Sequence, residues 1–148
     1  MKRIICYILI LAAVVLLPTK ATDVGKLRPI QTIAAYTSDS GYRILTDTMD
    51  SGYGKTLQLA VEDLKATTPA VIYLDTAQYL VVNEEAVIAE LYPYLSDRVK
   101  ICLSVGEPHM EDVSSFLSAH GDGPTVKQWK KGAKIPVLNC SDGRMSFQ

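Results

Sequence analysis

Cysteine, histidine, tryptophan and phenylalanine are scarce in this 148-residue chain. It has three cysteines, two histidines, one tryptophan and two phenylalanines. So few cysteines exclude a disulfide-rich scaffold of the kind that small secreted domains use. The histidines, His109 and His120, point in different directions on any helix that carries both, so they are a poor start for a three-ligand zinc site.

A concentration of charge is also lacking. Without Lys2, Arg3 and Lys20, the chain keeps 12 basic residues against 16 acidic ones, with no long run of either sign. Nucleic-acid binding through a basic surface is therefore not expected. Disorder is not expected either, because 48% of the residues are hydrophobic and only 21% are charged.

The longest uncharged hydrophobic segment, Ile4–Leu17, follows a short basic start and ends at Pro18. A membrane-spanning helix needs about 20 apolar residues, and this segment is shorter. The pattern is typical of a signal peptide, residues 1–21, with the small residue Ala21 before the cleavage site. We expect a secreted protein or one at the extracytoplasmic membrane surface. An uncleaved anchor is the alternative.

Hydrophobic periodicity over residues 22–148 predicts a single α/β domain. We expect one mixed β-sheet covered by helices, in the order ββαββαβααββ. Helices are predicted after Thr56, after Asn83, after Gly106-Glu107-Pro108 and from Val126 to about Lys131. The predicted strands are Arg28–Thr37, Tyr42–Thr48, Val71–Leu74, Tyr79–Val82, Val99–Val105, Ile135–Asn139 and Arg144–Gln148.

Turn and cap residues mark the ends of these elements. The segment 38–41 predicts a hairpin turn with glycine at its end, and 50–54 predicts a loop. Gly121 is expected to end a helix in the left-handed conformation. Thr125 and Gln128 match a capping box. A carboxyl-terminal hairpin is expected to turn at 142–143 and to pair with the main sheet.

Known catalytic and ligand-binding motifs fail on this sequence. Gly54-Lys55-Thr56 matches the end of a phosphate-binding loop, but Met49 stands where the first glycine is required. Asp47 and Asp50 hint at a calcium loop whose twelfth position is Gln58 instead of the bidentate glutamate. No serine lies in a Gly-x-Ser-x-Gly context. We therefore predict no catalytic, cofactor-binding or metal-binding residues, and no enzyme.

Two further groups of residues leave alternatives open. Cys102 on a predicted strand and Cys140 near a predicted turn can pair in an oxidising compartment, or remain a buried and an exposed free thiol. A cluster of lysines around a tryptophan is either an ordinary solvated face or a contact for anionic lipid. This basic cluster consists of Lys127, Trp129, Lys130, Lys131 and Lys134.

Several segments together resemble the amino-terminal domain of the Ger(x)C spore-germination proteins. They are Gly54–Ala66, Ile72–Leu74, Tyr79–Glu85, Leu95–Val105 and Ile135–Leu138 with Gly143. The resemblance is one of hydrophobic pattern and carries no catalytic residue. It implies a freestanding extracytoplasmic relative of that domain. The family's usual lipid-bearing cysteine has no counterpart in residues 19–23, which changes how such a protein would be anchored.

The leading hypothesis is an exported, non-enzymatic domain that acts by contact with a protein partner in spore germination or envelope assembly. One alternative is a small-ligand binding module that uses the loop Asp47–Tyr53, where glycines let the backbone approach a ligand. Another is an exported enzyme with an unrecognised site around Asp75, Glu107 and His109.

Overall fold

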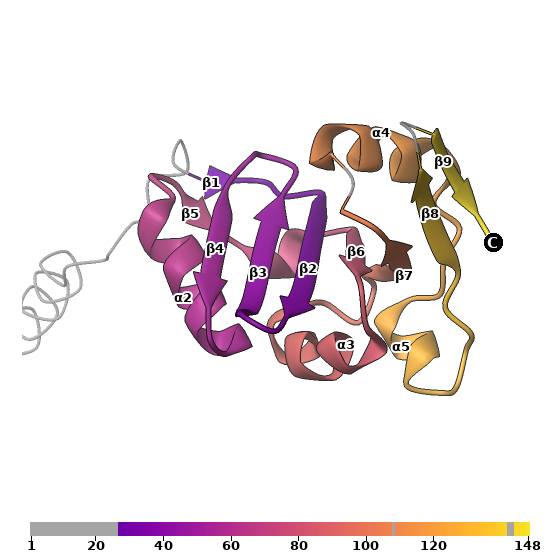
Figure 1. The fold of residues 1–148 in the computed structure, drawn as a ribbon, viewed down its shortest axis with the longest axis horizontal. Coiled ribbons are helices and arrows are strands. Elements are labelled where there is room, and N and C mark those ends of the chain that lie inside the picture. The colour runs from indigo at the N-terminus through magenta and orange to yellow at the C-terminus, as the bar shows by residue number, and fades with distance from the viewer. Residues whose placement is uncertain (1–26, 108, 142–143) are drawn as a thin grey trace, which may run out of the picture.

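A seven-stranded mixed sheet forms the centre of the molecule (Figure 1). The computed structural model describes residues 27–107, 109–141 and 144–148. The strand order is β4-β3-β2-β6-β7-β8-β9. These strands are β2 (Thr32–Ser38), β3 (Gly41–Thr46), β4 (Ser51–Gly54), β6 (Tyr79–Val82), β7 (Lys100–Val105), β8 (Val137–Ser141) and β9 (Arg144–Phe147). The single mixed sheet expected from the sequence is confirmed.

Four central strands, β2, β6, β7 and β8, run parallel, and antiparallel strands extend the sheet at both sides. A separate two-stranded parallel ladder joins β1 (Leu27–Arg28) to β5 (Val71–Ile72). Parallel neighbours need crossover connections, and helices supply them here. The predicted interleaving of helices with strands therefore matches the topology of the described residues.

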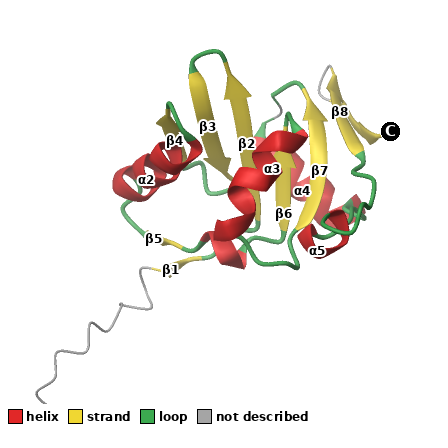
Figure 2. Cartoon of the chain, turned by 90° about the horizontal axis from the view of Figure 1, so that it is seen from below, coloured by secondary structure: helices red, strands yellow, loops and turns green. Residues whose placement is uncertain are grey.

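The helices cover the sheet on two faces (Figure 2). On one face, α2 (Leu57–Thr67), α3 (Glu85–Leu91) and α5 (Val126–Trp129) contribute to the larger hydrophobic core. On the other face, α4 (Met110–His120) packs over the central strands and forms a smaller core with them. In Figure 1, α3 and α4 lie on opposite sides of the strands, and no helix covers the side of β3 and β4 that faces the viewer.

Several local predictions are confirmed. The Thr56 side chain accepts a hydrogen bond from Leu59 N and caps α2, whose apolar stripe is buried. Thr125 and Gln128 form the expected capping box at the start of α5. Gly41 ends the predicted hairpin turn with a φ of 124°, a conformation that favours glycine. Two short 3₁₀ turns are also present: η2 (Leu74–Thr76) precedes β6, and η3 (Tyr92–Tyr94) follows α3.

Within the segment predicted as the loop 50–54, residues 51–54 form the edge strand β4 instead. Its glycines face α2, and a Cβ at Gly52 would overlap the Ala60 carbonyl and the Leu64 side chain. Side chains of α2 also hold the outer edge of β4. Asp63 accepts a hydrogen bond from Tyr53 N (2.9 Å), and a threonine hydroxyl of α2 bonds the Ser51 carbonyl (3.3 Å). Pairing and helix contact, not residue propensity, make this segment a strand.

Three other predictions about element ends are wrong. Gly121 ends α4 with a φ of −71°, which is not left-handed, and it is needed because a Cβ would overlap the Leu117 carbonyl. The predicted strand Val71–Leu74 stops at Ile72, where β5 loses its partner β1 and the chain turns into η2. Asn83 does not cap α3. Glu84 occupies the cap position and makes no side-chain cap hydrogen bond.

The carboxyl-terminal hairpin pairs with the main sheet as predicted. Leu138 of β8 is fully buried, and Phe147 of β9 packs against Phe116 of α4 with ring centroids 5.4 Å apart. The predicted signal peptide, residues 1–21, and the predicted turn at 142–143 lie outside the described residues. Among the helices that the structure describes, none has the length and apolar composition needed to span a membrane.

Candidate functional site at the carboxyl ends of the parallel strands

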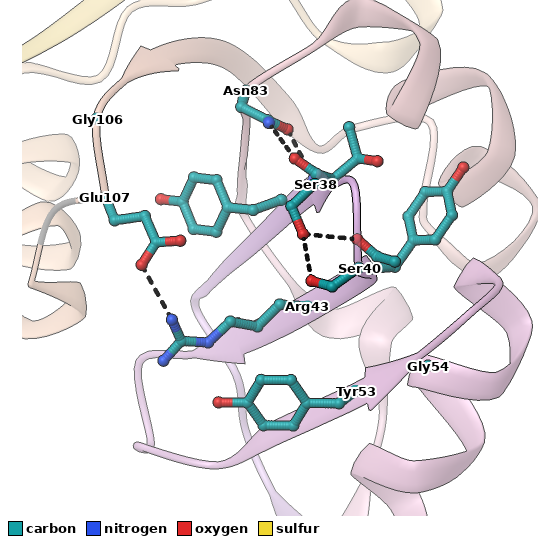
Figure 3. Close-up of a pocket in the computed structure, with 12 residues that line it drawn as sticks. Ser38, Ser40, Arg43, Tyr53, Gly54, Asn83, Gly106 and Glu107 are labelled. Atoms are coloured by element: carbon teal, nitrogen blue, oxygen red, sulfur yellow. Dashed lines mark hydrogen bonds and ion pairs between the residues drawn. The ribbon is translucent and has the colours of Figure 1, made fainter.

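A cavity of about 470 Å³ lies where the chain leaves the sheet centre in opposite directions. From β2 the chain continues to β3 and β4 on one side, and from the adjacent parallel strand β6 it continues to β7 on the other. Ligands of open α/β sheets bind at such a switch point, beyond the carboxyl ends of the strands. The cavity is lined by the ends of β2 and β6, the β2–β3 hairpin, the end of β4 and the loop after β7 (Figure 3). We call it the switch-point cavity.

Asn83 lines this cavity and connects the ends of β2 and β6. The β2–β6 ladder ends at the pair Ala35 and Val82, and Asn83 follows directly. Its Oδ1 accepts a hydrogen bond from Thr37 N (3.0 Å) and its Nδ2 donates one to Thr37 O (2.8 Å). The Asn83 side-chain amide therefore makes the hydrogen bonds to Thr37 that a further backbone pair between β2 and β6 would make. This role explains why Asn83 is not available to cap the helix that follows it.

Arg43 lies at the centre of a row of side chains on one face of the sheet. Its register partners are Tyr36 on β2 and Tyr53 on β4, and residues directly opposite each other share a face. The Arg43 guanidinium carbon lies 5.4 Å from the Tyr53 ring centroid, and Nη1 lies 2.9 Å from Glu107 Oε2. Figure 3 shows Arg43 reaching from its strand toward the loop that carries Glu107.

The ion pair between Arg43 and Glu107 contributes little to stability. Both side chains are partly exposed, by 38% and 60%. Exposed pairs of this kind contribute about 0–1 kcal/mol because water screens them. The main effects of the pair are to place a guanidinium and a carboxylate at the cavity and to neutralise the charge of each.

Tyr36 carries an unusual buried hydroxyl. Only 5% of the residue is exposed, and its hydroxyl has no hydrogen-bond partner among the described residues. Burial raises the pKa of Tyr36 above its ordinary value of 10.0, and the nearby Cys140 and Glu107 raise it further. Ser104 lowers this pKa slightly; it donates its own proton to Gly106 O (2.9 Å), which leaves its oxygen as an acceptor, although it makes no hydrogen bond with the phenol. The phenol is therefore protonated at neutral pH and can donate a hydrogen bond.

Arg43 also has an unsatisfied group. Its Nε is buried without a hydrogen-bond partner. A buried polar group without a partner costs about 1–3 kcal/mol relative to one that is hydrogen-bonded. The switch-point cavity therefore holds two such groups, the Tyr36 hydroxyl and Arg43 Nε. Both atoms are almost fully enclosed by protein atoms, so a bound molecule would reach them only after a shift of the lining side chains, and hydrogen bonds to both would then remove this cost.

The residues considered for an unrecognised enzyme site are not all brought together. Asp75 lies in η2 and lines a second cavity with Tyr79 and Lys100, at the amino ends of β6 and β7. Glu107 follows the carboxyl end of β7, and a strand of that length spans about 16 Å. His109 is exposed at the start of α4 and makes no cap hydrogen bond. Asp75 is therefore remote from Glu107.

The loop considered for ligand binding, Asp47–Tyr53, is divided between the two ends of the sheet. Asp47 accepts a hydrogen bond from Gln31 N (3.1 Å), just before β2, far from the switch-point cavity. Tyr53 is the one residue of this loop that lines the cavity. The glycine at 54 lines the cavity as well, and it follows the predicted loop directly. Ligand binding near Tyr53 stays a prediction, but the site's centre is Arg43.

Both described cysteines are free thiols. Register pairs β7 with β8 so that Asn139 lies opposite Val105. The neighbouring Cys140 is therefore displaced along the strands from Cys102 by about 13 Å, well beyond the Cα separation of about 7 Å that a disulfide tolerates. Burial raises the pKa of the Cys102 thiol to about 12. A disulfide between Cys102 and Cys140 would require a different pairing of these strands.

Part of the basic cluster is engaged within the fold. Trp129 Nε1 donates to Glu85 Oε1 (2.7 Å), and Lys130 Nζ pairs with Asp97 (3.0 Å). The other cluster lysines are exposed: Lys127, Lys131 and Lys134. Contact with anionic lipid stays a prediction, and it would rest on these three side chains rather than on the tryptophan.

Comparison of the chain with protein-family models, with curated proteins and with solved structures finds no match. Within the ranges 27–107, 109–141 and 144–148, no three His, Cys, Asp or Glu side chains are grouped so that they could hold a metal ion. The function is therefore argued from the switch-point cavity and the sequence. The signal for this site in the sequence was weak. It consisted of an asparagine after a buried strand, since the tyrosines beside Arg43 become its neighbours only through the strand pairing.

Proposed function

We propose that this chain is a non-enzymatic binding domain that takes a small polar molecule in the switch-point cavity. The observation that carries the proposal is the Tyr36 hydroxyl, which is buried at the cavity without a hydrogen-bond partner. The cavity volume falls within the range of about 300–1,000 Å³ that is typical of small-molecule sites. Its position at a switch point gives independent support.

The chemistry of the lining supports binding over catalysis. The charged side chains of the described lining, Arg43 and Glu107, neutralise each other. Among the described lining residues there is no histidine or cysteine. The Ser38 and Ser40 hydroxyls bond each other, and the one lining hydroxyl that donates to a carboxylate is that of Tyr42, which bonds Glu90 (3.0 Å) at the exposed surface. The amino-terminal signal pattern supports a place outside the cytoplasm for this binding domain.

The test is a thermal-shift screen with metabolites of all charge types. A ligand at one hundred times its Kd stabilises the folded state by about 2.7 kcal/mol and raises the Tm. We expect at least one compound to raise the Tm of the wild type and to do so far less for Tyr36→Phe. Tyr73→Phe removes an exposed hydroxyl outside the cavity and serves as the matched control. Failure of every compound, or equal shifts in all three proteins, would refute the proposal.

A second candidate function is contact with a protein partner in spore germination or envelope assembly. It is favoured by the uncovered face of β3 and β4, on which the Tyr53 side chain is 54% exposed. The resemblance of residues 54–105 to the Ger(x)C amino-terminal domain points the same way. A photo-crosslinking residue at position 53 should then capture one defined partner in the native organism. The same residue at position 66, on the exposed surface of α2, should not capture it.

A further inference from the structure

The charge balance of the switch-point cavity restricts what it can bind. Its charged lining residues within the described chain are Arg43 and Glu107, which lie in contact at 2.9 Å. A ligand with a net charge would therefore enter without a counter-ion of its own. Because both side chains are partly exposed, water screens part of such a charge, and the remaining cost of leaving it unpaired disfavours a charged ligand. The lining thus favours a ligand that is uncharged overall.

The hydrogen-bonding groups of the cavity include both donors and acceptors. Arg43 Nε is a donor without a partner, and the Tyr36 hydroxyl is a buried donor and acceptor without one. Ser38 and Ser40 bond each other at 2.8 Å and add two hydroxyls at the hairpin. A hydroxyl group donates one hydrogen bond and accepts two, so it is the ligand group that can meet both kinds of partner.

Tyr53 adds an aromatic surface beside these polar groups. Its side chain is 54% exposed and lines the cavity, and the Arg43 guanidinium lies over the ring. An aromatic ring provides apolar contact area at a small loss of side-chain entropy. A ring-shaped ligand can match both surfaces: hydroxyl groups around its rim would meet the polar groups of the cavity, and the carbon-bound hydrogens on its face would contact the Tyr53 ring.

We propose that the switch-point cavity binds an uncharged, ring-shaped polyol of the size of a monosaccharide or a cyclitol. This inference rests on the proposed function and specifies the ligand class. Arg43 and Tyr36 would bond ring hydroxyls, Glu107 would accept from a hydroxyl through its second oxygen, and Tyr53 would contact one face of the ring.

The experiment compares neutral rings with charged versions of the same rings, using the full chain and isothermal titration calorimetry. The neutral probes are glucose, galactose, mannose and myo-inositol. The charged probes are the uronates and amino sugars of the same three hexoses, with alanine as a compact zwitterion. We expect at least one neutral ring to bind at least tenfold more tightly than its uronate and its amino sugar.

Glu107→Gln gives a second readout that a purely structural role would not produce. It keeps the shape of the side chain but leaves the Arg43 charge uncompensated. We expect the affinity for the matching uronate to rise at least tenfold, with a change of less than threefold for the neutral ring. Glu62→Gln makes the same charge change on the exposed surface of α2 and should leave both affinities unchanged.

Three results would overturn the inference, and they differ in which part of the proposed function they leave intact. If the wild type prefers a uronate, an amino sugar or alanine, and Tyr36→Phe weakens that binding, the ligand class is wrong but the cavity is the binding site. If none of these probes binds while a compound from the wider thermal-shift screen does, the polyol class is again wrong. If neither set binds, the proposed function fails together with the inference.

Discussion

Replacing Tyr36 by phenylalanine should stabilise the unliganded protein. The change removes a hydroxyl that is buried without a partner and keeps the aromatic ring of a residue that is only 5% exposed and packs in the smaller core. A buried polar group without a hydrogen bond costs about 1–3 kcal/mol. Loss of one small oxygen from the packing offsets part of this gain. We expect a net increase of about 1 kcal/mol in the free energy of unfolding, which corresponds to about 4 °C in Tm for a domain of this size.

Urea unfolding followed by circular dichroism at pH 7 measures this change, with Tyr42→Phe as the matched control. The Tyr42 hydroxyl donates to Glu90 (3.0 Å) at the surface, so its removal should destabilise the protein by about 0.5 kcal/mol. The two variants should therefore differ in sign. A Tyr36→Phe protein that is less stable than the wild type would show that the hydroxyl has a partner in solution and would remove the main support for a ligand site.

Three further changes test the fold. Because the pKa of Cys102 is raised by burial from its ordinary value of 9.0 to about 12, the unfolded state loses this proton first. Stability should be nearly constant below about pH 8 and fall as the pH rises toward 12, by about 1 kcal/mol at pH 10. Cys102→Ala should show less of this fall in denaturant titrations at pH 7 and pH 10. In the same assay, Gly52→Ala should lower the free energy of unfolding by about 3 kcal/mol because the new methyl group overlaps α2. Ser51→Ala should lower it by less than about 1 kcal/mol. Equal effects of the two variants would contradict the packing described. Phe147→Ala should lower the free energy of unfolding by about 2 kcal/mol because the ring is partly buried against α4. Ser146→Ala, at an exposed position, should leave it nearly unchanged. An unchanged stability of Phe147→Ala would show that the final strand is dispensable.

The periodic elements of the fold could be predicted because each carries its own burial pattern. The helix α2 has an apolar stripe and a threonine cap, and β6 and β7 have the apolar positions of strands between helices. The strand β4 could not be predicted, since its segment is polar and rich in glycine. Two neighbours determine its structure: β3 pairs with it along one edge, and α2 packs against its glycines. Neither contact leaves a local pattern in the sequence.

Asn83 illustrates why the candidate site was harder to predict than the fold. An asparagine between a strand and a helix is a good cap by local rules. Its actual partner is the backbone of Thr37, 46 residues earlier, and that pairing exists only because β2 and β6 are adjacent. Glu107 and Arg43 are 64 residues apart and meet for the same reason. The strand order determines these contacts, and the strand order is not visible in any one segment.

Stability alone does not explain the residues of the switch-point cavity. The Arg43–Glu107 pair is exposed enough to contribute about 0–1 kcal/mol, and the Tyr36 hydroxyl and Arg43 Nε each carry an unsatisfied polar group. Phenylalanine at position 36 would satisfy the fold better than tyrosine does. Two other buried polar atoms without a partner in the described chain, Asp47 Oδ1 and Thr68 Oγ1, lie elsewhere. The Tyr36 hydroxyl and Arg43 Nε lie together in one cavity at a switch point, beside an ion pair that adds little to stability. Binding of a molecule that supplies the missing hydrogen bonds gives these features a common physical reason.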